Sequence, residues 1–514
     1  MKWISRVASD HELRVQILPG AQLKYFMSIK IPKEIKAISE KLSAAGFQAY
    51  LVGGCVRDLV LQKKPKDWDI ATNALPEEIQ KIFPDSFYEN KFGTVGVKTN
   101  ALDKSLEVVE ITTFRAEGDY FDNRHPDRIE FVKTIEEDLA RRDFTINALA
   151  IPLHLKSKKI EILDKYEGKK DLRKKIIRAV GNPLERFEED ALRLMRAIRL
   201  AVELDFQIEE QTFQAIKNKS SLLKVIAKER IRDELIRIIM TEKAALGIIL
   251  LEDAGLLEYI LPELREGIGC TQNKHHIYTV FEHNVRALNY AAEKKYSLEV
   301  RLAALLHDVG KPRSKKGEGE NATFYNHEVI GARMTLKILD RLHFPKEIIE
   351  KVVLLVRYHL FYYNVGEVTE SGVRRFLTKV GIENVDDLLK VREADRIGSG
   401  VPKAVPYKLR HLKFMIEKVR KDPISPKMLK VNGNDIMKIL NISPGPKIGW
   451  ILSILLEEVL DDPKKNNKEY LEKEVKYLGL LSQDELKKKA EEAQNKKEEF
   501  ESGIEKEIRK KYFV

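Results

Sequence analysis

The sequence predicts an α+β protein in which a small mixed β-sheet precedes an elongated, all-helical region. At 514 residues the chain is too long for one hydrophobic core, so several domains are expected. Residues 31–178 mix helices with strand-like, β-branched runs: LVGG, GTVGVKT, LEVVEITTF and IEFV. From residue 181 onward the strand signals stop. Apolar residues then recur at three- and four-residue spacing, as in amphipathic helices.

Stretches that contain glycine or proline, at 181–183, 267–269 and 398–402, are the expected joints between these parts. After residue 482 the chain is dominated by Lys and Glu, which favours an exposed helical tail. The predicted organisation is an N-terminal extension (1–30), a head (31–178), a helical neck (179–266), a middle domain (267–400), a helical C-terminal body (401–481) and a charged tail (482–514).

Composition excludes several classes of protein. No apolar run is long enough to cross a bilayer, and the first thirty residues lack the apolar core of a secretory signal. The two cysteines, Cys55 and Cys270, lie far apart, which excludes a disulfide framework and a cysteine zinc site and suits a reducing cytoplasm. The net charge of +11 favours a polyanionic partner such as nucleic acid, although lysine-rich helices also serve solubility.

A nucleotide site is indicated between residues 49 and 72. Gly53 and Gly54 follow a hydrophobic run and let backbone N–H groups approach a triphosphate, to which Arg57 can add a charge-assisted contact. On an extended strand Asp67 and Asp69 would point to one face, as two oxygen ligands for Mg²⁺. Taken separately, the glycines are typical of a turn and the aspartates of a solvated edge; their order and proximity favour nucleotidyl transfer.

Two further stretches can add to this site. Glu110, in EVVEITTF, is a candidate third metal ligand, but it is equally compatible with the solvent face of a half-buried strand. In RRDFTINALA, Arg141 and Arg142 can hold a triphosphate or the ribose, while Asp143 can orient an arginine or accept from a sugar hydroxyl. An N-cap with a surface ion pair is the alternative for this second stretch.

A helix is predicted over residues 187–201, in the stretch FEEDALRLMRAIRLA. Asp190, Arg193 and Arg196 would lie along one side, and Arg199 would drift toward the edge of this polar side. A second stripe can pack into the core: Leu192, Met195 and Ile198. The simple alternative is a surface helix with ion pairs three residues apart.

The same residues can also read a base. The Asp190 carboxylate can accept from the exocyclic amine of cytosine or adenine, and Arg193 can donate to the acceptors beside that amine. Uracil and guanine present a carbonyl oxygen to the carboxylate and would be rejected. Such a helix would select CTP and ATP without a nucleic-acid template.

These motifs, in their order LVGGCVRD, KDWDIAT, EITTFR, YFDNRHPDRIEFV, EEDLARRDFTINALA, GNPLERFEEDALRLMRAIRLA and ERIRDEL, resemble the class II tRNA nucleotidyltransferases. This family contains the bacterial CCA-adding enzymes and shares its head and neck with bacterial poly(A) polymerases. The resemblance covers residues 31–240 and continues more loosely through 443–466. It implies a nucleotidyltransferase head in which Asp67 and Asp69 bind Mg²⁺.

The resemblance also implies roles for other residues. Gly54, Arg57 and Arg142 would contact the nucleotide, and Asp190 with Arg193 would form the protein template for base choice. Arg196 and Arg199 would hold phosphates. The loop 115–127, with Asp122 and Arg124, resembles the family's flexible element for switching from CTP to ATP.

The middle of the chain resembles the HD phosphohydrolase superfamily. His283, the adjacent pair His307 and Asp308, and Asp395 follow the order of that superfamily's metal ligands, and imidazole and carboxylate groups bind divalent metals. His327, followed by Glu328, and His359 are candidates to complete the site for a second ion. The resemblance implies phosphatase or phosphodiesterase activity, or a scaffold that only binds tRNA.

The sequence therefore predicts a CCA-adding tRNA nucleotidyltransferase fused to an HD domain. It would add or repair the 3′-terminal CCA of tRNA from CTP and ATP, by two-metal attack of the RNA 3′-hydroxyl on the α-phosphate. The basic helical body would hold the acceptor arm through its phosphates and shape. The alternatives are a poly(A) polymerase and an HD phosphohydrolase with a nucleotide-binding head. The HD metal and the oligomeric state stay open.

Overall fold

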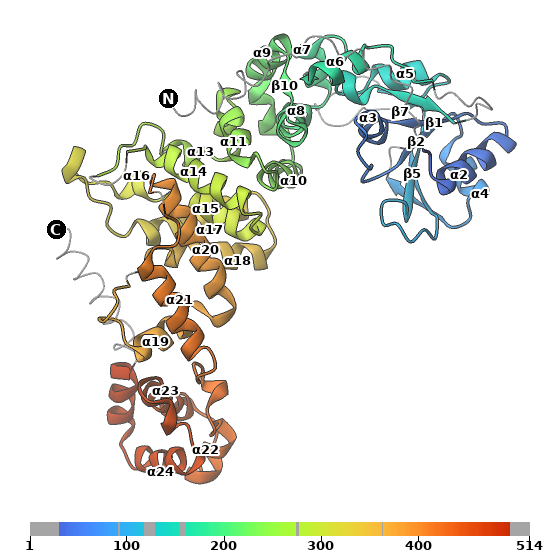
Figure 1. The fold of residues 1–514 in the computed structure, drawn as a ribbon. Coiled ribbons are helices and arrows are strands. Elements are labelled where there is room, and N and C mark those ends of the chain that lie inside the picture. The colour runs from blue at the N-terminus through green and yellow to red at the C-terminus, as the bar shows by residue number, and fades with distance from the viewer. Residues whose placement is uncertain are drawn as a thin grey trace. The chain divides into compact units, whose positions relative to one another are not determined.

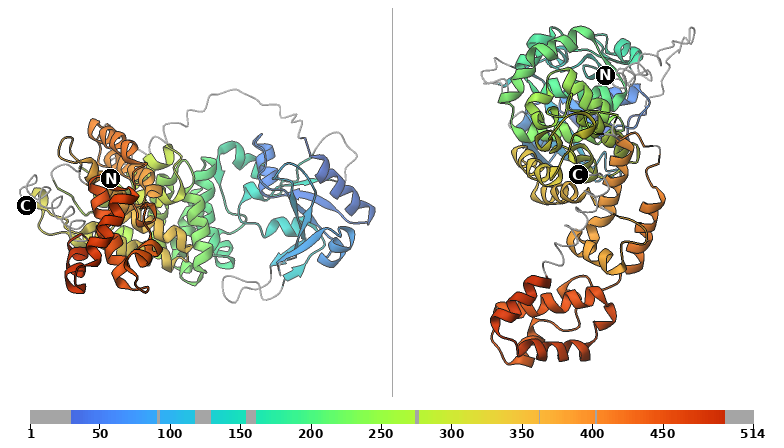
Figure 2. Two further views of the ribbon diagram at one scale, coloured as in Figure 1. Left: turned by 90° about the horizontal axis from the view of Figure 1, so that it is seen from below. Right: turned by 90° about the vertical axis from the view of Figure 1, so that its left-hand side faces the viewer.

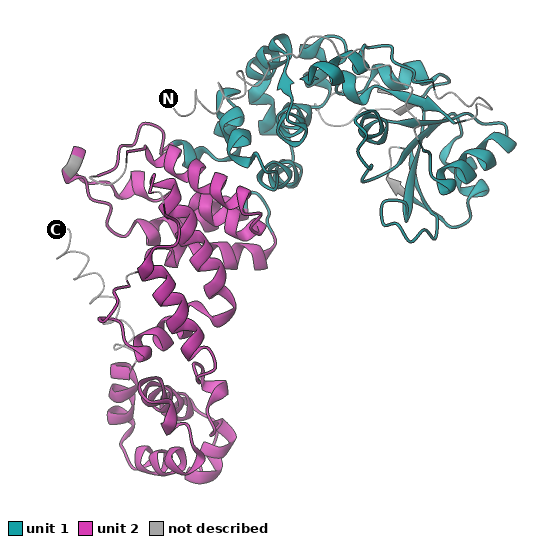
Figure 3. Ribbon diagram, in the orientation of Figure 1, with its two compact units in different colours: residues 1–265, 341–344 teal, residues 266–340, 345–514 magenta. Residues whose placement is uncertain are grey.

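The computed structural model describes residues 30–90, 93–117, 129–153, 161–273, 277–361, 363–401 and 403–493. The chain divides into two compact units, residues 1–265 with 341–344 and residues 266–340 with 345–514 (Figure 3). The predicted N-terminal extension, the 118–127 part of the switching loop with Asp122 and Arg124, and the end of the tail lie outside the described residues.

A six-stranded mixed sheet forms the core of the first part of unit 1 (Figure 1). Its strand order is β3-β4-β5-β2-β1-β8, with β2 and β5 parallel and the other neighbours antiparallel. The α+β prediction is therefore confirmed. The four β-branched runs correspond to β1, β4, β5 and β7, and the strand expected at Asp69 corresponds to β2, whereas β3, β6 and β8 were not predicted. The sheet consists of β1 (Ala49–Val52), β2 (Asp69–Thr72), β3 (Ser86–Asn90), β4 (Thr94–Lys98), β5 (Val108–Thr113) and β8 (Ala150–Pro152), and a separate hairpin of β6 (Arg115–Glu117) and β7 (Ile129–Phe131).

Helix α5 packs on the sheet through its apolar face. Ile135 and Leu139, four residues apart on one face, pack against Tyr50, Val52 and Phe114 in a buried cluster. The chain after α5 is thereby held at the sheet. The helices of this part are α2 (Lys33–Ala44), α3 (Gly54–Val60), α4 (Pro76–Ile82), α5 (Ile135–Ala140), the 3₁₀ turn η1 (Thr145–Asn147) and α6 (Gly168–Lys174).

The rest of unit 1 is helical with one exception. A two-residue strand β10 (Gln207–Ile208) pairs in parallel with β9 (Ile176–Ile177), so the prediction that strands stop at residue 181 is wrong by one short strand. Asp205, at φ +62°, ends the preceding helix and turns the chain into an extended path. The helices are α7 (Pro183–Glu189), α8 (Leu192–Leu204), α9 (Glu210–Lys219), α10 (Lys228–Ile239), α11 (Ala244–Asp253), α12 (Leu257–Ile260) and α13 (Pro262–Arg265).

The helix predicted over residues 187–201 is interrupted. The backbone of Asp190 is extended, at φ −140° and ψ 103°, and separates α7 from α8. Its Oδ1 accepts from the N–H of Leu192 at 3.0 Å and so satisfies an N–H at the start of α8. The apolar stripe of the prediction is confirmed, because Leu192, Met195 and Ile198 are buried.

Unit 2 is almost entirely helical. The nearly continuous apolar run of α15 (Leu298–Leu306) is buried along its length from Val300 and carries His307 at its end. The other helices are α14 (Val280–Glu293), α16 (Lys311–Ser314), α17 (His327–Arg341), α18 (Lys346–Tyr358), α19 (Glu370–Val380), α20 (Ile382–Gly398) and α21 (Tyr407–Val419), followed by α22 (Gly433–Leu440), α23 (Pro446–Asp461) and α24 (Lys468–Gly479), which pack against one another (Figure 2).

The start of the charged tail is helical, as predicted, from residue 483 to 493. It is not wholly exposed, because Leu486 is completely buried and Ala490 nearly so. Among the helices that the structure describes, none is both long and apolar enough to cross a membrane.

Candidate active site

The paired glycines form a turn between β1 and α3 that brings the backbone against charged side chains. Gly53 has φ +74°, and a Cβ there would lie 2.9 Å from Nη1 of Arg142 and 3.5 Å from Oδ2 of Asp69. A Cβ on Gly54 would lie 4.0 Å from Oδ1 of Asp67. Glycine is required at the first position by both its backbone conformation and its crowding. Both aspartates therefore face the turn.

Asp69 is the first residue of β2 and lies in register with Glu110 on the parallel neighbour β5. The N–H of Glu110 donates to the carbonyl of Trp68 at 3.1 Å, which fixes this register. Asp67 lies in a bend two residues before β2, so the prediction of a strand through both aspartates is wrong. The three carboxylates offer hard oxygen donors of the kind that bind divalent cations such as Mg²⁺.

Arg57, on α3, is held in place by two partners. Its Nη1 donates to Oδ1 of Asn147 at 2.9 Å, and its Nε donates to Oδ1 of Asp58 at 2.9 Å. In turn, the Asn147 amide donates to Oδ1 of Asp143 at 3.1 Å. This chain of hydrogen bonds links α3 to the segment after α5.

The two arginines of the RRD segment share one buried carboxylate that sequence reasoning missed, Asp138. Its Oδ1 accepts from Nη2 of Arg141 at 2.7 Å, and its Oδ2 accepts from Nη2 of Arg142 at 3.0 Å. Burial raises the pKa of Asp138, but the two guanidinium charges outweigh this effect and hold it at about 2. Asp138 is therefore ionised at neutral pH and fixes both arginines.

Asp143, which is buried, forms an ion pair with the partly exposed Arg196. Nε and Nη2 of Arg196 donate to Oδ2 of Asp143 at 2.8 and 2.6 Å. Burial raises the pKa of Asp143, but Arg196 overrides this and keeps it far below its ordinary value. The sequence left two roles open for Asp143: orienting an arginine or accepting from a sugar hydroxyl. In the structure Asp143 orients an arginine, Arg196.

Helix α8 presents a fixed guanidinium. Nη1 of Arg193 donates to the Arg186 carbonyl and Nη2 donates to the Arg141 carbonyl, each at 3.1 Å. Oδ2 of Asp190 accepts a hydrogen bond from Nη2 of Arg230 at 2.9 Å. Arg230 belongs to the ERIRDEL stretch, and the sequence analysis gave it no role. The surface-helix alternative is wrong, because Arg193 is 6% exposed.

Arg199 departs from the prediction. It is 5% exposed rather than at the edge of a polar side, and its Nε lies 3.2 Å from Oε2 of the buried Glu234. The sequence could not show this, because Glu234 lies on a different helix, α10. Arg199 is not one of the residues that line the pocket described next.

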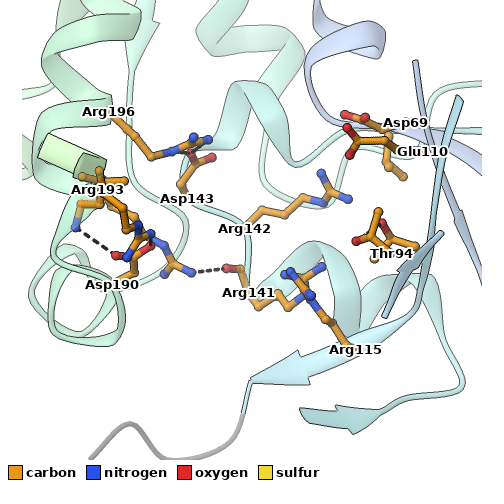
Figure 4. Close-up of a pocket in the computed structure, with 14 residues that line it drawn as sticks. Asp69, Thr94, Glu110, Arg115, Arg141, Arg142, Asp143, Asp190, Arg193 and Arg196 are labelled. Atoms are coloured by element: carbon orange, nitrogen blue, oxygen red, sulfur yellow. Dashed lines mark hydrogen bonds and ion pairs between the residues drawn. The ribbon is translucent and has the colours of Figure 1, made fainter. Parts of the chain in front are cut away.

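A pocket of about 460 Å³ joins these groups. Asp69 and Glu110 lie at one side, Asp190 and Arg193 lie at the other, and Arg142 extends between them (Figure 4). The carboxylates of Asp69 and Glu110 therefore share one pocket with Asp190 and Arg193. The lining consists of Val52, Asp69, Thr94, Glu110, Thr112, Arg115, Arg141, Arg142, Asp143, Asp190, Leu192, Arg193, Arg196 and Arg230.

Unit 2 holds a second cluster of titratable side chains. His283 on α14, His307 after α15 and Asp395 on α20 present ligand atoms within 4.8 Å of one another. A neighbouring set with the same spacing consists of Asp308, His327 and His359. The structure thus brings together all six residues that the sequence analysis named.

Asp308 connects the two sets. Its Oδ2 lies 3.1 Å from Nε2 of His283, and its Oδ1 lies 3.3 Å from Nε2 of His327. Its Oδ2 also lies 2.6 Å from Nζ of Lys311, a buried lysine that sequence reasoning missed. Glu328 belongs to neither set, and its Oε1 lies 3.4 Å from Nη1 of Arg357. Each set offers imidazole and carboxylate donors of the kind that bind a divalent ion, and Asp308 lies close to residues of both sets.

The carboxylates also determine protonation in this cluster. Burial lowers the pKa of His307, but Asp308 and Asp395 raise it to about 10. The pKa of Asp395 lies well below its ordinary value, because His283 and His307 counter the effect of burial. The His307 imidazole must lose this proton before it can ligate a metal.

Comparisons with known proteins match separate segments of the chain to different domain families. Family models match three segments: "Poly A polymerase head domain" at 49–178, "Probable RNA and SrmB- binding site of polymerase A" at 205–268, and "HD domain" at 280–397. The CCA-adding enzyme of Ligilactobacillus salivarius is 35% identical over 87% of this chain and 98% of its own length. The A-adding tRNA nucleotidyltransferase of Deinococcus radiodurans is 32% identical over 80% and 91%, respectively.

A solved structure is similar over the same extent. The CCA-adding enzyme of Bacillus stearothermophilus, crystallised in complex with CTP, is 27% identical with a TM-score of 0.65, covering 86% of this chain and 96% of that one. The likeness therefore extends over most of both chains. The chain belongs to the class II CCA-adding tRNA nucleotidyltransferases, the family related to bacterial poly(A) polymerases, and it carries an HD domain.

Proposed function

We propose that this enzyme transfers cytidylate from CTP and adenylate from ATP to the 3′ end of tRNA, with release of pyrophosphate and without a nucleic-acid template, to build or repair the terminal CCA. The single observation that carries the proposal is the pocket that joins Asp69 and Glu110 to Asp190 and Arg193. The Ligilactobacillus relative is a CCA-adding enzyme matched over 98% of its length, and the Bacillus CCA-adding enzyme was solved with CTP. The net charge of +11 suits the RNA partner.

In this proposal Asp67, Asp69 and Glu110 hold Mg²⁺ beside the Gly-Gly turn. When bound, Mg²⁺ neutralises phosphate charge and favours in-line attack by the RNA 3′-hydroxyl with loss of pyrophosphate. Arg57 and Arg142 bind the triphosphate, and backbone N–H groups at the turn assist them. These groups are fixed before the nucleotide enters, so little reorganisation accompanies the reaction.

Base choice rests on Asp190 and Arg193. The carboxylate accepts from the amine of cytosine or adenine, and the guanidinium donates to the neighbouring ring acceptors. The carbonyls that hold Arg193 keep its donor geometry constant. A rigid edge of this kind reads the base without a template strand.

The test is stepwise addition of labelled CTP and ATP to a tRNA that lacks its CCA. Two cytidines followed by one adenosine, lost in Asp69→Ala, support the proposal. A growing adenosine tail would instead indicate a poly(A) polymerase. Addition of a single adenosine only to tRNA that already ends in CC would indicate an A-adding enzyme like the Deinococcus relative.

We further propose that the HD cluster is a metal-dependent phosphohydrolase. The observation that favours it is the position of Asp308 between the two ligand sets. His283, His307 and Asp395 would hold one ion, and His327 and His359 with Asp308 the other. Metal-bound water supplies the nucleophile for a phosphate ester in such sites.

The two activities can be separated by mutation. Asp67→Ala should abolish nucleotide addition and leave hydrolysis of p-nitrophenyl phosphate intact, whereas Asp308→Ala should do the opposite. Loss of both activities in either variant would contradict the two-site proposal. Hydrolysis without any nucleotide addition by the wild type would favour an HD phosphohydrolase whose head only binds nucleotide. Assays with Mg²⁺, Mn²⁺, Ni²⁺ and Zn²⁺ added singly identify the HD metal.

A further inference from the structure

Helix α21 of unit 2 exposes aromatic rings along one face. Tyr407, His411 and Phe414 are four and three residues apart, so their side chains share that face. Tyr407 and Phe414 are each 62% exposed, which is unusual for rings of this size in a folded protein. With Tyr363 they make up what we call the aromatic patch.

The rings of the aromatic patch are arranged around His411. Its ring centroid lies 5.9 Å from that of Tyr363, 6.0 Å from Tyr407 and 6.1 Å from Phe414. The Tyr363 hydroxyl lies 2.5 Å from Nδ1 of His411, a hydrogen bond that fixes the imidazole plane. The patch is therefore a preformed aromatic surface rather than a set of independent exposed side chains.

The surroundings of the aromatic patch are cationic. Most of the positive side chains on α21 have acidic or amide partners, such as Lys413 with Glu393. Arg410 lies between Tyr407 and Phe414 on the same face and forms no ion pair with any described residue. Between positions 403 and 421 the chain has seven basic residues and one acid: Lys403, Lys408, Arg410, Lys413, Lys418, Arg420 and Lys421, against Glu417.

We propose that the aromatic patch stacks against an unpaired base of the RNA substrate, with Arg410 contacting an adjoining phosphate. The proposal rests on the proposed action of the enzyme on RNA. Aromatic faces bind unpaired bases by stacking, and an unpartnered arginine beside them binds the backbone. A protein-binding face would instead be depleted of lysine, whereas this segment has five lysines between positions 403 and 421.

The experiment measures addition of labelled CTP to tRNA that lacks its CCA. Tyr407→Leu and Phe414→Leu remove a ring and keep its bulk, whereas Tyr407→Phe and Phe414→Tyr keep the ring. Tyr477→Leu is the matched control, because Tyr477 is a 52% exposed tyrosine on α24 of the same unit. All three substituted positions are exposed, and circular dichroism melts verify folding of the five variants.

The leucine variants should raise KM for the RNA by at least about fivefold, the loss of one base–aromatic stack, without changing kcat or KM for CTP. The ring-keeping variants and Tyr477→Leu should behave as wild type. Arg410→Gln should weaken RNA binding and make its log–log dependence on salt shallower by about 0.7.

Three results would overturn the stacking proposal: an unchanged KM for RNA in the leucine variants, an equal rise in Tyr477→Leu, or an altered sedimentation coefficient with RNA affinity intact. The last result would assign the face to a second copy of the chain. Failure of the proposed function is distinguishable, because the wild type would then add no nucleotide. Filter binding of the same RNA by the same variants would still test stacking.

Discussion

Replacing Asp138 with asparagine tests whether one buried carboxylate holds two arginines of the pocket, Arg141 and Arg142, in place. Asp138 is 1% exposed and accepts four guanidinium hydrogen bonds, from Nε and Nη2 of Arg141 and of Arg142. Asparagine keeps the volume but turns an amide N–H₂ toward one of the two arginines. At least one arginine therefore loses its partner and its fixed orientation.

The size of the effect follows from the same contacts. A charge-assisted hydrogen bond contributes about 1.5–3 kcal/mol, so misplacing Arg142 should lower kcat/KM for CTP roughly ten- to a hundredfold. KM for the RNA should not change. The pKa of about 2, against an ordinary 3.8, corresponds to about 2 kcal/mol of folding stability at neutral pH.

That stability has a defined pH dependence. Because the folded state lowers the pKa of Asp138, its contribution is present above about pH 4 and disappears as the pH falls toward 2. Urea unfolding of wild type and Asp138→Asn should therefore differ at pH 7 and converge at low pH. Steady-state kinetics with CTP at neutral pH complete the assay.

Glu252→Gln is the matched control. It removes a carboxylate that holds Arg265 through two hydrogen bonds, at 2.7 and 3.0 Å, outside the pocket. This variant should lose some stability and keep kcat/KM for CTP. Equal catalytic losses in the two variants, or full activity in Asp138→Asn, would refute the assigned role of Asp138.

Three further outcomes are expected. Arg230→Ala frees Oδ2 of Asp190 and should lower discrimination against UTP by at least about fivefold, measured by misincorporation; unchanged discrimination would show that the pair does not set base choice. Asp308→Asn should reduce bound metal per chain, measured by elemental analysis, while CTP addition continues; full metal content would contradict the bridging role. EDTA should stop CTP addition and added Mg²⁺ should restore it; addition that persists in EDTA would refute metal dependence.

The sequence predicts best what local patterns determine. The Gly-Gly turn and the strand pattern around Glu110 follow from backbone freedom and side-chain alternation over a few residues. The HD residues were also found, because histidine and aspartate in that order have few other common roles. The stripe of Leu192, Met195 and Ile198 follows from helical periodicity.

What the sequence misses depends on contacts between distant segments. Asp138 lies in EEDLA, which looks like the solvated face of a helix, yet the packing of Ile135 and Leu139 on the sheet buries it. At Asp190 the side chain accepts from the N–H of Leu192 at the start of α8. A local hydrogen bond of this kind is an alternative to a continuous helix, and the sequence does not show which of the two forms. Arg199 is buried because α10 supplies Glu234.

The pocket contains more arginines than acids, and most of these arginines have fixed acidic partners. Six arginines and four carboxylates line it, and so many cations would repel one another without fixed partners. Arg141 and Arg142 share Asp138, Arg196 is held by Asp143, and Arg230 by Asp190. Asp138, Asp143 and Asp190 thus set the directions of four guanidinium groups that line the pocket. Under the proposed function, the selectivity of the site would therefore depend as much on these three acids as on the arginines themselves.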